Sequence, residues 1–305
     1  MNPVIMKKLA KPLLFFAAFI WGMSFFVMKN TLDSIPVFWL LTFRFAVGGL
    51  LLGLVCFFIW HPKLTKDDLW RGGLLGILLF LAYSVQTFGL VYTTPSNNAF
   101  LTTVYCVLVP FLYWGISHQK PDRFHLMAAL FCVVGVGLVS ITGQFTIAIG
   151  DSLTLLCALF YALHIVAVNH LSDGKNIYVL TAVQFTVVAL CSAIGGMLTQ
   201  PFPIHVFTDS SMIFPLFYLC VLATTVALLF QNVGQVWSDP SSASVILSLE
   251  SVFGVLFSVV FYGDPVTPRL LLGFGFIFFA VLCSETKFSF LQKKKTPNSC
   301  SCNTL

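Results

Sequence analysis

The sequence predicts an all-α polytopic membrane protein with about ten transmembrane helices, arranged as two inverted repeats of five helices each. Three observations predict this fold class. Of the 305 residues, 58% are hydrophobic and only 9% are charged, whereas soluble domains carry roughly a quarter charged residues. Apolar runs long enough to cross a bilayer follow one another through the whole chain. Two similar short motifs, 145 residues apart, each open such a run.

The apolar runs give the predicted elements in order. A bilayer core of ~30 Å needs about 20 helical residues, and the connections between the runs are short and rich in Pro, Gly, Asn and Asp. A proline inside the fourth run, Pro110, predicts a kink there. No polar stretch is long enough to form a separate soluble domain. The predicted spans are 12–31, 36–60, 72–92, 97–117, 124–142, 151–170, 176–199, 212–236, 242–262 and 268–286.

Basic residues gather on alternate connections, and this bias predicts the orientation, because short loops keep Lys and Arg in the cytoplasm. With the N-terminus inside, the outer segments hold only Lys29 and Arg269. The sequence therefore predicts a multi-pass protein of the cell (plasma) membrane with both termini cytoplasmic and an even number of spans. The inner segments would hold Lys7, Lys8, Lys11, Lys63, Lys66, Arg71, Lys120, Arg123, Lys175, Lys287, Lys293, Lys294 and Lys295.

The two motifs are residues 94–99 (Thr-Pro-Ser-Asn-Asn-Ala) and 239–244 (Asp-Pro-Ser-Ser-Ala-Ser). Each predicts a helix start, because proline is favoured at the first helical position and Thr94 or Asp239 can accept hydrogen bonds from the free amides of the first turn. The motifs open the fourth and ninth spans. They therefore suggest that the chain contains the same unit twice.

Further pairs support a duplication. The first and sixth spans align with an offset of 140 residues, and the third and eighth spans with an offset of 145. Because each unit has five spans, an odd number, the second must enter the membrane from the opposite side, which makes an inverted repeat. The predicted units are residues 12–142, residues 151–286 and a basic cytoplasmic tail, 287–305. The aligned pairs are Trp21 with Tyr161, Ser24 with His164, Arg44 with Gln184, and Gln86 with Gln231.

The chain resembles the drug/metabolite transporter superfamily, and more narrowly its EamA-like permeases, over about residues 12–286. The motifs that carry the resemblance are residues 18–25 (Ala-Phe-Ile-Trp-Gly-Met-Ser-Phe), 43–45 (Phe-Arg-Phe), 248–253 (Ser-Leu-Glu-Ser-Val-Phe) and 262–264 (Tyr-Gly-Asp). One departure is visible. Many members carry an acidic residue after the fourth span, matching Asp264 after the ninth, and this chain has His118 and Gln119 there.

Two ionisable residues lie deep inside predicted spans, Arg44 in the second and Glu250 in the ninth. A charge at the bilayer centre costs ~2.5 to 3.5 kcal/mol on insertion scales, so such residues usually face protein or water. Glu250 is a candidate for proton or cation coupling or for pairing with a substrate amine. Arg44 is a candidate counter-charge or carboxylate anchor. The alternative is structural, a buried ion pair or an arginine that reaches the headgroups.

Polar and aromatic residues at helical spacing predict the wall of a central cavity, where inverted-repeat transporters bind substrate. In the fourth span they form a single face. In the first and sixth spans an aromatic residue precedes a hydrogen-bonding one by three positions. For the first and sixth spans the alternative is that the aromatic residues pack in the bundle and His164 donates to a neighbouring carbonyl, and Gln86, Gln231 and Asn232 could instead bond across helices. The predicted substrate-binding residues are Trp21, Ser24, Gln86, Asn98, Thr102, Tyr105, Tyr161, His164, Gln231 and Asn232.

The predicted function is secondary transport, as an exporter of small metabolites such as amino acids or amphipathic drug-like compounds, by alternating access. A lipid or lipid-linked-sugar flippase is the alternative. An intramembrane enzyme is a distant third, because no span carries paired Asp residues and no His-Glu-x-x-His motif exists. The sequence predicts no enzyme activity, no cofactor, no metal and no nucleic-acid partner. The expected partners are a small-molecule substrate, membrane lipids and a coupling proton or cation, in a monomer or homodimer.

Overall fold

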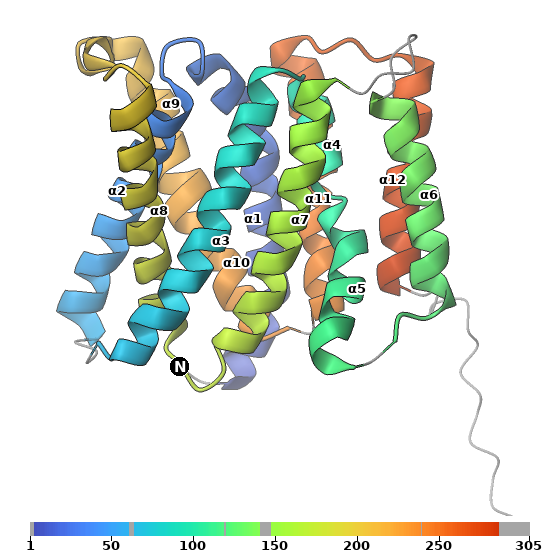
Figure 1. Cartoon of the computed structure of the whole chain (residues 1–305), viewed down its shortest axis with the longest axis horizontal. Helices are drawn as coiled ribbons and strands as arrows, with labels where there is room; N and C mark the ends of the chain where they lie inside the picture. The colour runs from blue at the N-terminus through green and yellow to red at the C-terminus, as the bar shows by residue number, and fades with distance from the viewer. Residues whose placement is uncertain (1–2, 61–63, 119, 141–147, 239, 287–305) are drawn as a thin grey trace, which may run out of the picture.

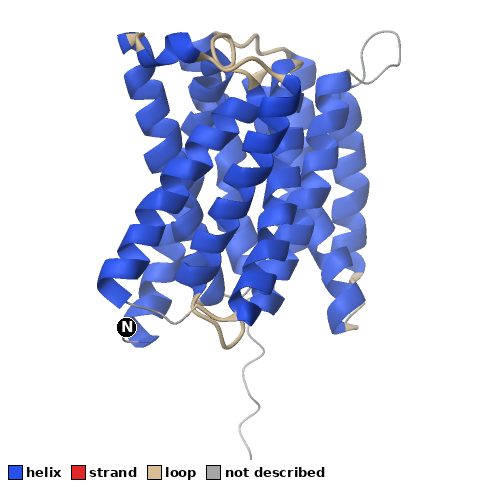
Figure 2. Ribbon diagram, turned by 60° about the vertical axis from the view of Figure 1, so that its left-hand side comes forward, coloured by secondary structure: helices blue, strands red, loops and turns tan. Residues whose placement is uncertain are grey.

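The computed structural model describes residues 3–60, 64–118, 120–140, 148–238 and 240–286. The described residues form helices and their connections, without strands (Figure 2). The long helices stand side by side as a bundle, with the N-terminus at its lower end in Figure 1. In the described part of the chain, seven helices are long and apolar enough to cross a membrane, and three shorter apolar helices accompany them.

The helices cover the predicted spans, although α1 begins nine residues before the predicted start at residue 12 and the fourth and eighth spans each consist of more than one helical segment. In the first half they are α1 (Pro3–Thr31), α2 (Val37–Val55) with a π-helical end η1 (Cys56–Trp60), α3 (Lys66–Val91), α4 (Pro95–Thr102), α5 (Tyr105–Ser117) and α6 (Arg123–Ser140). In the second half they are α7 (Ile149–Leu171), α8 (Ile177–Thr199), α9 (Ile213–Phe217), π-helix η4 (Tyr218–Val226), α10 (Ala227–Val236), α11 (Pro240–Phe257), π-helix η5 (Ser258–Tyr262) and α12 (Pro268–Thr286). Two 3₁₀ turns, η2 (Ile204–Phe207) and η3 (Ser210–Met212), precede α9.

Capping residues fix two of the helix starts. The Thr94 hydroxyl accepts a hydrogen bond from the Asn97 amide (3.2 Å) with Pro95 in the first turn, which confirms the predicted start of α4. At α3, Thr65 and Asp68 form a capping box, so this helix begins six residues before the predicted span. The expected cap at Asp239 lies outside the described residues, as does the tail 287–305.

The fourth span is interrupted at a place that the sequence does not indicate. Pro110 lies within α5, whereas the helix breaks about two turns earlier, at Thr103 and Val104. There the amides bond to carbonyls three residues back, as Val104 does to Leu101 (3.3 Å). This break separates α4 from α5.

The two halves pack against each other along most of their length. α1 lies on α11, α2 on α8, α3 on α7 and α8, and α6 on α12, at one edge of the bundle (Figure 1). Glycines allow the close approach of α3 to α8, because a Cβ atom at Gly72 or at Gly76 would lie 2.7 Å from a valine side chain. The absence of a Cβ atom at these two positions is therefore needed for the packing of α3 on α8. Gly53 of α2 differs, because a Cβ atom there would meet nothing within 4 Å.

This difference between glycines gives a testable prediction. In Gly76→Ala the new Cβ would press on Val187 (2.7 Å) and on the backbone oxygen of Gln184 (3.1 Å). We expect a loss of about 1 to 3 kcal/mol of stability, the usual cost of overpacking, measured as a lower melting temperature in detergent. Gly53→Ala is the matched control, since it removes the same backbone freedom without a contact. Equal melting temperatures for the two variants would contradict the packing described.

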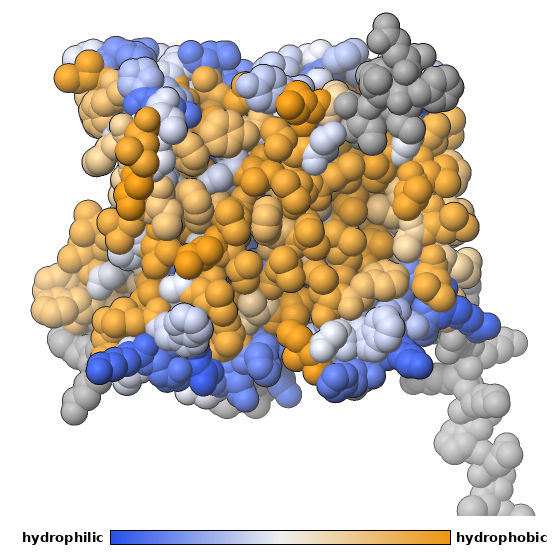
Figure 3. Space-filling view, in the orientation of Figure 1, coloured by the Kyte–Doolittle hydropathy of each residue, from blue (hydrophilic) through white to orange (hydrophobic). Residues whose placement is uncertain are grey.

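Ion pairs tie α3 to the α7–α8 turn at the N-terminal end of the bundle. Lys175 Nζ lies 2.8 Å from a carboxylate oxygen of Asp67 and 3.1 Å from one of Asp68. Hydrogen bonds to these carboxylates raise the pKa of Lys175, and the bond to Asp67 has the larger effect. Arg71 adds a bond to the Leu171 carbonyl (3.1 Å). Polar residues gather at both ends of the face seen in Figure 3, with an apolar belt between them, as a membrane protein requires.

Candidate functional site

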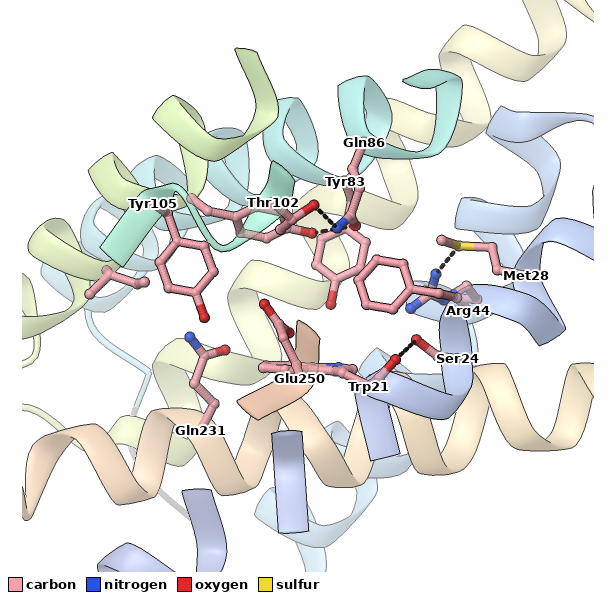
Figure 4. Close-up of a pocket in the computed structure, with 13 residues that line it drawn as sticks. Trp21, Ser24, Met28, Arg44, Tyr83, Gln86, Thr102, Tyr105, Gln231 and Glu250 are labelled. Carbon is pink, nitrogen blue, oxygen red and sulfur yellow. Dashed lines mark hydrogen bonds between the residues drawn. The ribbon is translucent and has the colours of Figure 1, made fainter. Parts of the chain in front are cut away.

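A small cavity lined by polar, aromatic and aliphatic side chains lies between helices of both halves (Figure 4). It has a volume of about 40 Å³, room for a few water molecules at roughly 10 to 15 Å³ each. Side chains from α1, α2, α3, α4, α5, α7, α10 and α11 form its wall. They are Trp21, Ser24, Phe25, Met28, Arg44, Tyr83, Gln86, Thr102, Tyr105, Tyr161, Ile165, Gln231 and Glu250.

The first helix contributes one continuous face to the cavity. Trp21, Ser24, Phe25 and Met28 follow one another at intervals that place them on the same side of α1. The Trp21 ring is fixed because its Nε1 donates a hydrogen bond to the carbonyl oxygen of Ala223 (2.8 Å), in the second half of the chain. This face therefore combines a held aromatic ring with an apolar stripe.

Arg44 enters the cavity from α2 and is 1% exposed. Its Nε donates to the Thr224 hydroxyl (2.8 Å) and a terminal nitrogen contacts the Met28 sulfur (3.1 Å). The guanidinium carbon lies 5.1 Å from the centre of the Tyr83 ring, in a cation–π arrangement. Among the described residues no carboxylate forms an ion pair with Arg44. Its charge is held by neutral partners alone.

Glu250 enters from α11 and is 5% exposed. Its carboxylate lies in the middle of the cavity, with the side chains of Tyr105 and Gln231 pointing towards it (Figure 4). No ion pair within 4 Å joins it to Arg44 or to another cation in the part of the chain that the structure describes. The two buried charges thus share one cavity without neutralising each other by direct contact.

The remaining wall is a hydrogen-bonded network around Gln86 of α3. The Gln86 amide donates to the Thr102 hydroxyl (3.1 Å), and its oxygen accepts a bond from the Tyr161 hydroxyl (2.8 Å). Thr102 is the last residue of α4, next to the break in the fourth span. Tyr161 also packs edge-to-face on Tyr83, 5.5 Å between ring centres. Three helices, α3, α4 and α7, are linked here at one side of the cavity.

The structure places nine of the twelve predicted site residues on this cavity, and three of them elsewhere. His164 is one of the three. It is buried between α7 and α8, with Nε2 3.0 Å from the amide oxygen of Gln184. Tyr161 and His164 are three positions apart, about 60° around a helix, and this angle is enough to point Tyr161 into the cavity and His164 at the neighbouring helix.

The other two are Asn98 and Asn232, which also bond between helices. Asn98 donates to the Thr154 hydroxyl of α7 (2.8 Å). Asn232 donates to the Thr181 hydroxyl of α8 (2.9 Å). Since Asn232 directly follows the cavity residue Gln231, it must lie about 100° further around α10. The alternative of interhelical bonding, left open by the sequence for Asn232, describes that side chain as the structure places it, and Asn98 behaves in the same way.

Four cavity residues were not predicted, namely Phe25, Met28, Tyr83 and Ile165. Each lies one or two helical turns from a residue that was. Phe25 and Met28 follow Trp21 by four and seven positions, Tyr83 precedes Gln86 by three, and Ile165 follows Tyr161 by four. Helical spacing was thus a signal that could have found all four. A search restricted to polar and repeated residues misses them because three are apolar.

Comparisons with known proteins agree with this picture. The EamA-like transporter family matches the chain twice, over residues 9–141 and 148–286. An uncharacterized transporter of Archaeoglobus fulgidus (strain ATCC 49558) is 36% identical over 266 residues, which cover 87% of this chain and 82% of that protein. The uncharacterized transporter YetK of Bacillus subtilis (strain 168) is 30% identical over 130 residues, which cover 40% of this chain and 38% of that protein. A crystal structure with 16% sequence identity has the same fold, with a TM-score of 0.71 over 93% of this chain and 98% of that one.

A polytopic helical bundle with relatives named as transporters points to a membrane transporter, not to an enzyme. The chain belongs to the EamA-like transporter family. This membership confirms the resemblance to the drug/metabolite transporter superfamily that the sequence motifs indicate.

Proposed function

We propose that this chain is a secondary exporter of small metabolites that carry both an ammonium and a carboxylate group, with amino acids as the first class to test. The observation that carries the proposal is the pair of buried charges, Arg44 and Glu250, which line one cavity from different halves without an ion pair between them. Such an arrangement offers one site for each charge of a zwitterion.

The energetics of buried charge favour this assignment. A charge taken out of water is costly unless it is paired, and an ion pair between protein groups would remove the need for a ligand. Among the residues that the structure describes, the partners of Arg44 are neutral. A substrate carboxylate would supply the missing counter-charge and could accept two parallel hydrogen bonds from the guanidinium fork. Glu250 would pair with the ammonium group in the same way.

The rest of the wall suits an amphipathic solute. Trp21, Tyr83, Tyr105 and Tyr161 surround the two charges with aromatic surface. Aromatic faces attract cations and also accept apolar groups. The proposed substrates therefore have one apolar portion next to the two charged groups, which leaves strongly hydrophilic sugars as poor candidates.

We further propose that transport proceeds by alternating access of two inverted repeats of five helices, in the plasma membrane, with both termini cytoplasmic. The double match of the family supports two equivalent halves. So does the packing of α2 on α8 and of α6 on α12, since the members of each pair are counterparts in the proposed repeat. The small volume of the cavity is consistent with this proposal, in which helices part on one side at a time to admit the substrate.

Reconstitution into liposomes tests the proposal. Purified protein should move radiolabelled amino acids with apolar side chains. The matching amine, which lacks the carboxylate, and the matching acid, which lacks the amine, should compete about 10- to 100-fold more weakly, because each loses charge-assisted hydrogen bonds. Liposomes loaded on the inside with substrate, with protein of known orientation, test the direction. Transport of lipid-linked sugars without transport of any zwitterion would contradict the proposal and favour a flippase.

A further inference from the structure

The eighth span contains the π-helix η4, nine residues from Tyr218 to Val226. π-helical segments are rare and are frequent at functional sites. Two adjacent threonines stabilise this one, because their hydroxyl groups donate to carbonyl oxygens five residues back. The Thr224 hydroxyl bonds to Leu219 (2.7 Å) and the Thr225 hydroxyl to Cys220 (2.8 Å). The segment does not line the cavity itself.

Hydrogen bonds from the first half of the chain converge on this segment. Trp21 donates to the carbonyl oxygen of Ala223 (2.8 Å), and Arg44 donates to the hydroxyl of the next residue, Thr224 (2.8 Å). In the opposite direction, the Tyr218 hydroxyl donates to the carbonyl oxygen of Ile20 (2.7 Å). Two cavity side chains, Trp21 and Arg44, are thus held by neighbouring residues of one π-helix.

The hydrogen bond to Thr224 occupies Nε of Arg44 and so affects which donors of the guanidinium group remain for a ligand. The hydroxyl proton of Thr224 is used by the Leu219 carbonyl, so the oxygen can only accept, and it accepts from Nε. A guanidinium group has five N–H donors. The bonds to Thr224 and to the Met28 sulfur use two of them, which leaves donors on the terminal nitrogens for a ligand in the cavity.

We propose that Thr224 is a positioning residue for substrate recognition, which fixes the Arg44 guanidinium so that its terminal nitrogens meet the carboxylate of the substrate. This inference rests on the proposed function, in which Arg44 binds that carboxylate. Thr224 acts through Arg44 and does not touch the substrate. Its neighbour Thr225 lies in the same π-helix and makes the same kind of hydroxyl bond, but none to Arg44.

The two threonines give a matched experiment in proteoliposomes. We expect Thr224→Val, which removes the acceptor and nearly keeps the shape, to raise KM for a zwitterionic amino acid about 10-fold, the effect of losing a bond to a charged group. KM for the amine that lacks the carboxylate and the maximal rate for both substrates should stay the same. Thr224→Ser should restore the KM of the unmodified protein, and Thr225→Val should leave it unchanged.

The ratio of the two KM values separates positioning from a general structural effect. A damaged fold would alter transport of both substrates together, and Thr224→Ala provides a second variant without the acceptor if valine is not tolerated. An unchanged ratio in Thr224→Val or Thr224→Ala, beside normal transport by the unmodified protein, overturns this inference alone. Failure of the unmodified protein to transport any zwitterion overturns the proposed function, and the inference with it.

Discussion

Arg44→Gln is expected to lower the transport efficiency for a zwitterionic substrate by about 100-fold or more, the cost of removing one member of a buried charge pair. The substituted amide keeps a hydrogen-bond donor but loses the positive charge and the fork that a carboxylate fits. Initial rates of uptake into proteoliposomes, at several substrate concentrations, measure the effect. The variant should transport the amine analogue, which has no carboxylate, at nearly the rate at which the unmodified protein transports the same amine.

Arg44→Lys is the control for this prediction. Lysine keeps the charge but cannot reproduce the Nε bond to Thr224 or the planar contact with Tyr83. We expect the transport efficiency of Arg44→Lys to lie between that of the unmodified protein and that of Arg44→Gln. A buried charge without a counter-charge costs free energy, so Arg44→Gln should melt at or above the melting temperature of the unmodified protein. A similar loss for amine and zwitterion, or a sharp fall in melting temperature, would assign Arg44 a structural role.

Glu250→Gln is expected to abolish substrate accumulation driven by a pH gradient while leaving exchange of labelled for unlabelled substrate. The amide has nearly the shape of the carboxylate but cannot bind and release a proton at physiological pH. Glu250 is the acidic residue among those that line the cavity, so its replacement should leave gradient-driven uptake at the level of empty liposomes. Exchange needs only binding and conformational change. It should persist within about 10-fold of the rate of the unmodified protein, because the amide oxygen of glutamine can still accept a hydrogen bond from the substrate ammonium.

Glu250→Asp provides the comparison, because it keeps a titratable carboxyl group with a side chain one methylene shorter. It should retain gradient-driven accumulation at a reduced rate. If Glu250→Gln accumulates substrate in response to a pH gradient as the unmodified protein does, Glu250 is not the coupling group. If both variants lose exchange as well, Glu250 acts mainly in binding.

Composition and apolar run length were enough to place the helices, because these properties are averages over many residues. The contacts of a single side chain are not averages of this kind. Asn98 and Thr102 share a helix face by spacing, yet only Thr102 reaches the cavity, since Asn98 meets a hydroxyl group of α7 first. Sequence spacing gives the direction of a side chain around its own helix, and the identity of the facing helix decides what it touches.

The two irregular helices show the same limit. The fourth span breaks at Thr103 and Val104, which have no obvious helix-breaking character, and Pro110 lies within α5. In the eighth span, Thr224 and Thr225 bond to carbonyl groups five residues back, and nothing local distinguishes this pattern from an ordinary helix. Both irregularities adjoin the cavity or the residues that hold its wall. Their geometry depends on contacts between distant parts of the chain.

The bond between Arg44 and Thr224 joins residues that are 180 positions apart, and the bond from Trp21 spans 202 positions. During synthesis the second span therefore enters the membrane long before its partner exists. An arginine at the centre of a helix costs ~2.5 to 3.5 kcal/mol on insertion scales, and that cost stands until the eighth span arrives. The first five spans made alone should consequently be a substrate for quality-control proteolysis, and co-expression of residues 148–305 from a second gene should rescue them.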